Sequence, residues 1–205
     1  MTPDAIKKLA ALLSELPSLG PRQATRLAFH IAGLDKQTVE DIIETLKSVA
    51  KVKRCTHCFV LDELLDGLCT ICRSPRRNQA LVAIVEKETD VHTLEKTRAF
   101  TGRYLVLGQL SKDGILNSQH KQRLQALKHF IEDLPPQAGL PSGQAEEIIL
   151  ALSPTTYGDV NASVLAGALR ALTPKITRLA RGIPTGGEIE FADEDTLGAA
   201  LQNRN

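Results

Sequence analysis

The stretch Ala80-Leu-Val-Ala-Ile-Val-Glu-Lys-Glu-Thr-Asp-Val91 is an apolar run that ends in charged residues and leads into a helical pattern. From this point on, apolar runs alternate with helical stretches, which predicts strands at 80–85, 104–107, 148–152 and 176–180 and helices near 91–97, 119–133 and 161–172. Such alternation is typical of a mostly parallel sheet with crossover helices. The Pro- and Gly-containing segment 134–143 is expected to be a surface loop.

The residues on either side follow other patterns. The first 54 residues are expected to be all helical, because apolar side chains recur at helical spacing over 6–16, 22–32 and 39–49. After Arg181, a Gly- and Pro-rich stretch leads to an expected strand at 188–191 and a last helix at 196–201. The predicted fold class is therefore α+β with several domains, which are 1–54 (helical), 55–78 (a small loop-rich module), 79–177 (α/β) and 178–205 (a strand-helix tail).

Composition narrows the possible functions. The 205 residues hold 25 Lys and Arg against 24 Asp and Glu, so any binding of nucleic acid must be argued locally. Aromatic residues make up only 3% of the chain, which favours contact with a nucleic-acid backbone over stacking on bases. We see neither a secretory signal nor an apolar run of about 18 residues, and we therefore expect a cytoplasmic protein. A local excess of basic residues brackets the cysteine segment, at Lys51, Lys53, Arg54, Arg73, Arg76 and Arg77.

The strongest chemical signal is a pair of Cys-x-x-Cys motifs, Cys55–Cys58 and Cys69–Cys72. Four thiolates can close a tetrahedral shell around zinc and leave no position open for a substrate, so we expect one structural zinc ion per chain. His57 is the alternative ligand, but four cysteines already fill the shell. A thioredoxin-like redox pair would need a single motif at the start of a helix, which this segment does not offer.

A second signal is the turn Leu16-Pro-Ser-Leu-Gly-Pro-Arg-Gln-Ala-Thr-Arg-Leu27, which joins two predicted helices. Backbone N–H groups at a helix N-terminus can bind an anion, and Arg22 and Arg26 lie one helical turn apart. We therefore expect these two arginines to contact DNA phosphates without regard to base sequence. The alternative is that the turn has no function beyond joining the helices.

These motifs together resemble the RecR family of bacterial recombination mediators. The hairpin at 16–27 is similar to the family's helix-hairpin-helix, the cysteines fall at its zinc element, and Val85-Glu-Lys-Glu-Thr-Asp-Val91 resembles the start of its Toprim domain. The match continues through Thr101-Gly-Arg-Tyr104, Leu152-Ser-Pro-Thr-Thr-Tyr-Gly158 and Ala180-Arg-Gly-Ile-Pro-Thr-Gly-Gly-Glu-Ile-Glu190. The chain departs from the family at Ser18, where a glycine is usual, and over 108–147.

The resemblance implies a non-catalytic protein that forms a dimer or a tetrameric ring and acts with RecO and RecF to load RecA at single-stranded gaps. Catalytic Toprim domains hold divalent metal with a glutamate and an Asp-x-Asp motif. Here Glu86 is present, Ser153 and Thr155 stand at the aspartate positions, and Asp159 is the nearest other carboxylate. Glu86 and Asp159 are expected to make local hydrogen bonds or to contact a partner protein.

Two alternatives belong to other classes. One is a magnesium-dependent Toprim nuclease or phosphotransferase, which a nicking assay would detect. The other is a zinc-stabilised protein-interaction module without a DNA role, which would not be retained on DNA at moderate salt. The sequence does not indicate the oligomeric state or a preference for duplex or single-stranded DNA.

Overall fold

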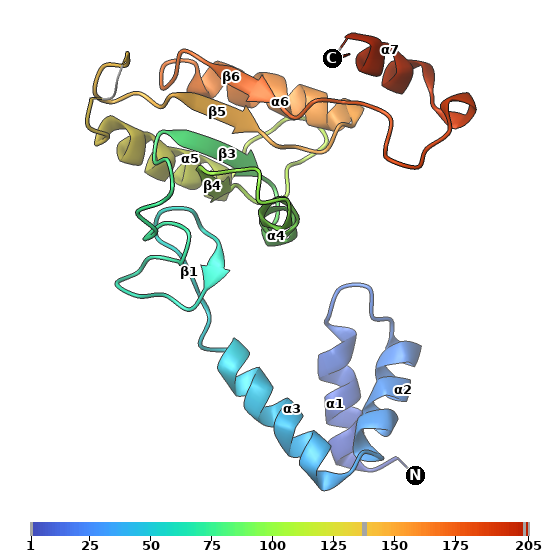
Figure 1. Cartoon of the computed structure of the whole chain (residues 1–205). Helices are drawn as coiled ribbons and strands as arrows, with labels where there is room; N and C mark the ends of the chain where they lie inside the picture. The colour runs from blue at the N-terminus through green and yellow to red at the C-terminus, as the bar shows by residue number, and fades with distance from the viewer. Residues whose placement is uncertain (1, 137–138, 203, 205) are drawn as a thin grey trace. The chain divides into compact units, whose positions relative to one another are not determined.

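The computed structural model describes residues 2–136, 139–202 and 204. It divides into two compact units, residues 1–52 and residues 53–205. Each unit is described by itself, and Figure 1 shows the elements of both.

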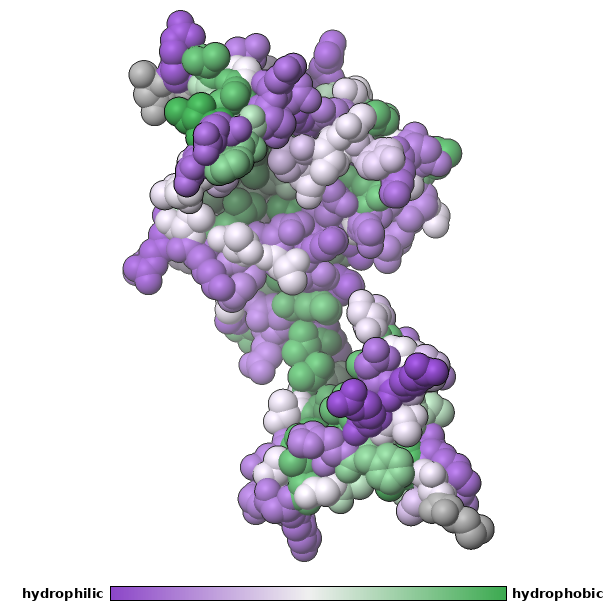
Figure 2. All heavy atoms as spheres, turned by 90° about the vertical axis from the view of Figure 1, so that its right-hand side faces the viewer, coloured by the Kyte–Doolittle hydropathy of each residue, from purple (hydrophilic) through white to green (hydrophobic). Residues whose placement is uncertain are grey.

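The first unit consists of three helices, α1 (Asp4–Ser14), α2 (Pro21–Ala32) and α3 (Lys36–Val49). Helices α1 and α2 pack together, and the fully buried Ala24 and Ala28 lie on the inner face of α2. Small side chains at these positions let the two helices approach closely. Several larger apolar side chains of the unit remain exposed, including Leu46 (62%) and Val49 (59%) on α3. Figure 2 shows hydrophobic side chains at the surface among the charged ones of these helices.

Helix α3 begins three residues before the start that periodicity predicts. Asp35 caps it: its carboxylate accepts a hydrogen bond of 3.0 Å from the backbone N–H of Thr38 and another of 2.6 Å from the Thr38 hydroxyl. A cap satisfies backbone donors that have no partner within the helix, so the helix extends back to the capping residue. The apolar pattern alone does not contain this information.

The expectation of helix up to residue 54 is wrong at its last two positions. Lys53–Arg54 form a short strand, β1, that pairs antiparallel with β2 (Leu61–Asp62). The cause lies in the first cysteine motif, because the backbone N–H of Cys55 donates a 2.9 Å hydrogen bond to the carbonyl oxygen of Val60 and so closes a hairpin. The cysteine module therefore begins with a strand, and it contains a second strand where a loop was expected.

The α/β region has the predicted architecture, a four-stranded parallel sheet with the order β4-β3-β5-β6. The strands are β3 (Leu81–Val85), β4 (Arg103–Val106), β5 (Glu147–Leu150) and β6 (Ile176–Arg178), and the helices are α4 (Glu88–Lys96), α5 (Ser118–Glu132) and α6 (Thr156–Leu169). Residues 137 and 138 of the expected loop 134–143 lie outside the described residues. Helix α6 begins five residues before its predicted start, because the Thr155 hydroxyl caps it with a 3.1 Å hydrogen bond from the N–H of Gly158.

The two faces of the sheet carry separate hydrophobic clusters. One face packs against α5 and α6, through residues such as Ile84, Leu127 and Leu165. The other packs against α4 and the cysteine module, through Val85, Val91 and Tyr104. Both faces are thus covered, which explains why the central strands are continuous apolar runs and not alternating ones.

The tail differs from expectation in its first element. Residues Ile189–Phe191 form a 3₁₀ turn where a strand was predicted, and the predicted last helix is present as α7 (Glu194–Gln202). A strand needs a neighbour for its backbone hydrogen bonds, and the sheet of the described residues does not include this segment. Ile189 is 69% and Phe191 79% exposed.

Candidate functional sites

The four cysteines form one buried cluster. The sulfur atoms of Cys55, Cys58, Cys69 and Cys72 all lie within 4.8 Å of one another. Cys58 Sγ and Cys69 Sγ are 3.4 Å apart, close to the separation of about 3.8 Å that tetrahedral ligands have around a zinc ion with 2.3 Å bonds. Among the described residues, this is the only group of three or more side chains that could hold a metal ion.

Backbone groups support the same interpretation. The N–H of Cys69 points at Cys55 Sγ at 3.4 Å, and the N–H of Cys72 points at Cys69 Sγ at 3.3 Å. Donors of this kind orient metal-binding thiolates and offset their negative charge. The thiols also titrate as a group: hydrogen bonding among them lowers the pKa of Cys55, with Cys58 the main cause, and raises the pKa of Cys58. The donor set and its spacing fit a structural metal ion.

His57 lies outside this cluster, as expected. Its ring packs against Phe130 of α5, with 5.5 Å between the ring centroids. Burial lowers the pKa of His57, and the nearby Arg103 guanidinium lowers it further. The residue thus belongs to the contact between the cysteine module and α5.

The hairpin presents its two arginines to solvent. Gly20 caps α2 without a side-chain hydrogen bond and Pro21 occupies the first turn, so N–H groups at this helix end have no side-chain acceptor. Arg22 and Arg26 are exposed on α2, and within the described residues neither forms a salt bridge. This arrangement can accept a phosphate.

Ser18 occupies a strained position in the same hairpin. Its φ is 67°, in the left-handed region that glycine adopts without cost. By the resemblance to the helix-hairpin-helix, this serine stands where a glycine is usual. The chain adopts the glycine-like conformation despite the side chain.

The carboxyl edge of the sheet contains Glu86 and Asp159. Glu86 follows β3 and accepts a 3.2 Å hydrogen bond from the backbone N–H of Leu110. Asp159 lies in the first turn of α6 and forms ion pairs with Arg178, at 2.6 Å, and with Arg181. These arginines lower the pKa of the Asp159 carboxyl, with the hydrogen bond from Arg178 as the main cause. Both acids therefore make local contacts within the chain.

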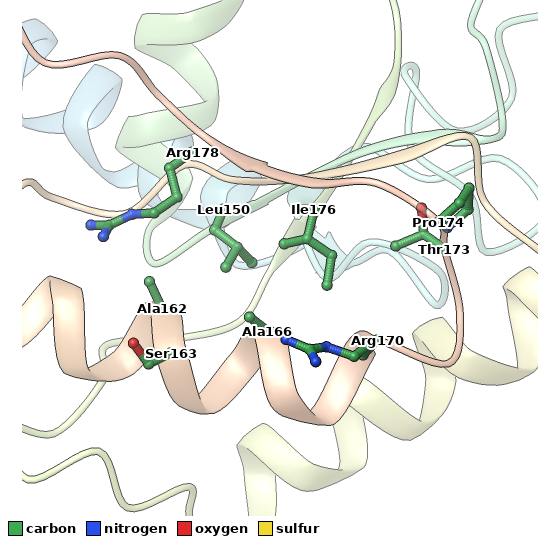
Figure 3. Close-up of a pocket in the computed structure, with 9 residues that line it drawn as sticks. All are labelled: Leu150, Ala162, Ser163, Ala166, Arg170, Thr173, Pro174, Ile176 and Arg178. Atoms are coloured by element: carbon green, nitrogen blue, oxygen red, sulfur yellow. The ribbon is translucent and has the colours of Figure 1, made fainter. Parts of the chain in front are cut away.

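A separate hollow of about 380 Å³ opens between α6 and the edge strand β6 (Figure 3). Leu150 and Ile176 point from the sheet toward the helix, where Ala162 and Ala166 are too short to fill the space. Its lining has no carboxylate, imidazole or thiol; it consists of Leu150, Ala162, Ser163, Ala166, Arg170, Thr173, Pro174, Ile176 and Arg178. It offers a surface for binding and no groups for acid–base chemistry.

Comparison with known proteins covers nearly the whole chain. Residues 80–180 match the family model of the Toprim domain, and residues 182–205 match that of the RecR C-terminal region. The chain is 37% identical over 201 residues to "Recombination protein RecR" of Paenarthrobacter aurescens, with 98% of this chain and 96% of the relative covered. The chain belongs to the RecR family.

Two further RecR proteins match this chain with similar sequence identity and coverage. The recombination protein RecR of Frankia alni is 40% identical over 200 residues, which cover 97% of this chain and 95% of the relative. That of Myxococcus xanthus is 37% identical over 207 residues, which cover 100% of this chain and 98% of the relative. Within the described residues of this RecR family member, no helix is both long and apolar enough to cross a bilayer.

Sequence reasoning missed three arginines that complete these sites. Arg178 and Arg181 pair with Asp159, and the fully buried Arg103 contacts the cysteine cluster. The sequence could have indicated that Arg103 is buried, because this residue stands directly before the apolar strand predicted to begin at Tyr104. The sequence does not indicate the pairing of Arg178 and Arg181 with Asp159, because Asp159 lies about 20 residues away along the chain.

Proposed function

We propose that this protein is a non-catalytic, DNA-binding recombination mediator of DNA repair, which acts with RecO and RecF to load RecA at single-stranded gaps. A role in recombination is supported by similarity over nearly the full length to proteins named recombination protein RecR. The proposed location is the cytoplasm, where bacterial DNA lies. The absence of catalysis, the DNA binding and the bound zinc ion are proposed from the chemistry of the sites.

One observation carries the non-catalytic assignment. Ser153 and Thr155 stand where catalytic Toprim domains have aspartates, and the nearest other carboxylate, Asp159, is neutralised by two arginines. Magnesium-dependent chemistry on a phosphodiester needs several carboxylates free to hold the ion. Glu86 alone cannot supply them. Binding without strand cleavage is therefore the activity that this sheet edge supports best.

DNA binding is assigned to the hairpin. Arg22 and Arg26 are exposed on one face of α2, beside a helix N-terminus whose backbone donors point outward. These groups bind phosphates and read no base edges, so the contact is independent of sequence. Specificity would then come from RecO, RecF and the structure of the DNA.

We assign one structural zinc ion per chain to Cys55, Cys58, Cys69 and Cys72. The closed shell of four buried sulfurs supports zinc, which prefers tetrahedral thiolate sites of this kind. When bound, the ion supplies folding free energy to a module that has little apolar core of its own. The four thiolates would hold the ion.

Self-association is the last part of the proposal. On α3, the apolar side chains Ile43, Leu46 and Val49 are about half exposed or more, and in the tail Ile189 and Phe191 are mostly exposed. Large apolar side chains gathered on one helix face usually mark a protein interface. We infer that a second copy of the chain covers such surfaces, in a dimer or in a tetrameric ring.

The proposal is tested with full-length, zinc-loaded protein. Light scattering after size exclusion should give the mass of a dimer or a tetramer, and mobility shifts should show binding to unrelated duplex, gapped and single-stranded DNAs at moderate salt. Co-elution with purified RecO should follow. A monomer that fails to bind any of these DNAs and does not bind RecO would contradict the proposal.

A further inference from the structure

Arg103 is a fully buried cation without a carboxylate partner. It lies on β4 and has no exposed surface. Its Nε and Nη1 atoms have no hydrogen-bond partner, and within the described residues no acidic side chain forms a salt bridge with it. A buried charge without compensation is strongly destabilising. We therefore expect a negatively charged group close to the Arg103 guanidinium.

Among the described residues, the cysteine cluster is the neighbour of Arg103 that can carry negative charge when it holds a metal ion. Arg103 Nη2 lies 3.8 Å from the sulfur of Cys72. On the other side, the guanidinium lies over the ring of Phe130 on α5, with 3.4 Å from its central carbon to the ring centroid.

The net charge of a metal-loaded cysteine site explains why Arg103 lies next to Cys72. Four thiolates around one divalent ion leave a net charge of about −2 on the site. In a buried region, a single cation at contact distance stabilises that charge strongly. With neutral thiols and no metal, the same guanidinium would remain uncompensated. Arg103 and the loaded site therefore stabilise each other.

A backbone contact joins the same two parts. The N–H of Val106 on β4 donates a 2.8 Å hydrogen bond to the carbonyl oxygen of Cys58. The first cysteine motif thus covers β4, an edge strand of the sheet. Arg103 belongs to this strand, and Cys72, which it contacts, belongs to the cysteine module. Phe130, which closes the site from α5, lies within the divergent stretch 108–147.

We propose that Arg103 is the counter-cation of the metal-loaded cysteine site and that its charge raises the affinity of the chain for that metal. The inference rests on the proposed occupation of the cysteines by zinc. Arg103 is a positioning residue that acts through the thiolates. It also makes metal loading a condition for stable attachment of the cysteine module to β4.

The test compares zinc affinities of full-length variants, measured by competition with a chromophoric chelator. Arg103→Met removes the charge and keeps an apolar stem of similar length, and we expect it to lower zinc affinity at least about tenfold. Arg103→Lys keeps the charge and should stay within about threefold of the wild type. Arg123→Met is the matched control, because Arg123 is also buried but donates to the carbonyl oxygen of Val106, and among the described residues no hydrogen bond joins it to a cysteine.

The outcomes separate the alternatives. Wild-type affinity in Arg103→Met overturns the proposal, and so does an equal loss in Arg123→Met, which would indicate general destabilisation. If Arg103→Met is insoluble, folded and zinc-loaded Arg103→Lys supports the proposal, while failure of both variants overturns it, because shape and not charge would then matter. A wild-type chain without zinc would refute the proposed metal itself.

Discussion

Arg178 at the end of β6 donates a 2.6 Å hydrogen bond to the carboxylate of Asp159 in the first turn of α6. Arg181 pairs with the same carboxylate oxygen. Asp159, at the carboxyl edge of the sheet, is thus held by two cations from the chain itself. A metal ion would have to displace both guanidiniums to bind there.

The first prediction concerns catalysis at this edge. Wild-type protein, Glu86→Ala and Asp159→Ala should all leave supercoiled plasmid intact in the presence of Mg²⁺, because too few carboxylates are free to hold the ion. Any deficit of the variants should appear in partner binding. Magnesium-dependent nicking by the wild type that disappears in Glu86→Ala would refute the assignment.

The second prediction concerns the hairpin turn. Ser18→Gly should raise the free energy of unfolding by up to about 1 kcal/mol, because glycine adopts the left-handed conformation of this position without strain. It should also tighten DNA binding if the turn positions the phosphate contacts. Ser18→Ala keeps the Cβ atom and is the control. Equal stability of the glycine and alanine variants in thermal unfolding would show that the turn is not strained.

The third prediction concerns DNA affinity. Arg22→Ala with Arg26→Ala should weaken binding to every DNA sequence alike and flatten the slope of log affinity against log salt by about one unit per arginine. The matched control is Lys36→Ala with Lys47→Ala, which removes two exposed cations that are paired with glutamates on α3. If the arginine pair changes nothing in folded protein, the DNA surface lies elsewhere, with Lys51, Lys53 and Arg54 as the next candidates.

Metal loss is the subject of the fourth prediction. Cys58→Ser should yield metal-free or insoluble protein, since removal of one ligand opens a site whose binding energy stabilises the module. His57→Ala should retain zinc, because His57 lies outside the cluster. Elemental analysis of the purified proteins measures both. Folded wild type without zinc would be evidence against the assignment.

The fifth prediction concerns Gly158, which precedes Asp159. A Cβ atom at this position would lie 1.9 Å from the carbonyl oxygen of Ser153, so Gly158→Ala must displace the backbone at the start of α6. We expect a loss of about 1 to 3 kcal/mol in the free energy of unfolding. Gly167→Ala on the same helix meets no atom within 4 Å and should stabilise the protein by about 0.5 to 1 kcal/mol. Denaturant unfolding of the pair would reveal whether the two substitutions differ in sign.

Helix ends show where sequence patterns lose precision. Apolar periodicity located α2 closely, but it placed the starts of α3 and α6 three and five residues late, because the caps Asp35 and Thr155 act through hydrogen bonds and not through hydrophobicity. The strand predicted at 188–191 was wrong for a different reason. Its residues have strand character, but a strand must pair with a neighbour, and neither sheet of the described residues includes this segment.

The parallel sheet, the cysteine cluster and the family can be predicted from the sequence, because each depends on residue types at short, fixed spacings. The positive φ of Ser18 also follows from local sequence, as a serine in a glycine position. The pairing of charged side chains, in contrast, depends on contacts that form only when the chain folds. Arg103 meets the cysteine cluster and Arg178 meets Asp159 across pairs of segments that folding brings together. Electrostatic compensation acts through space, and the order of residues along the chain does not record it.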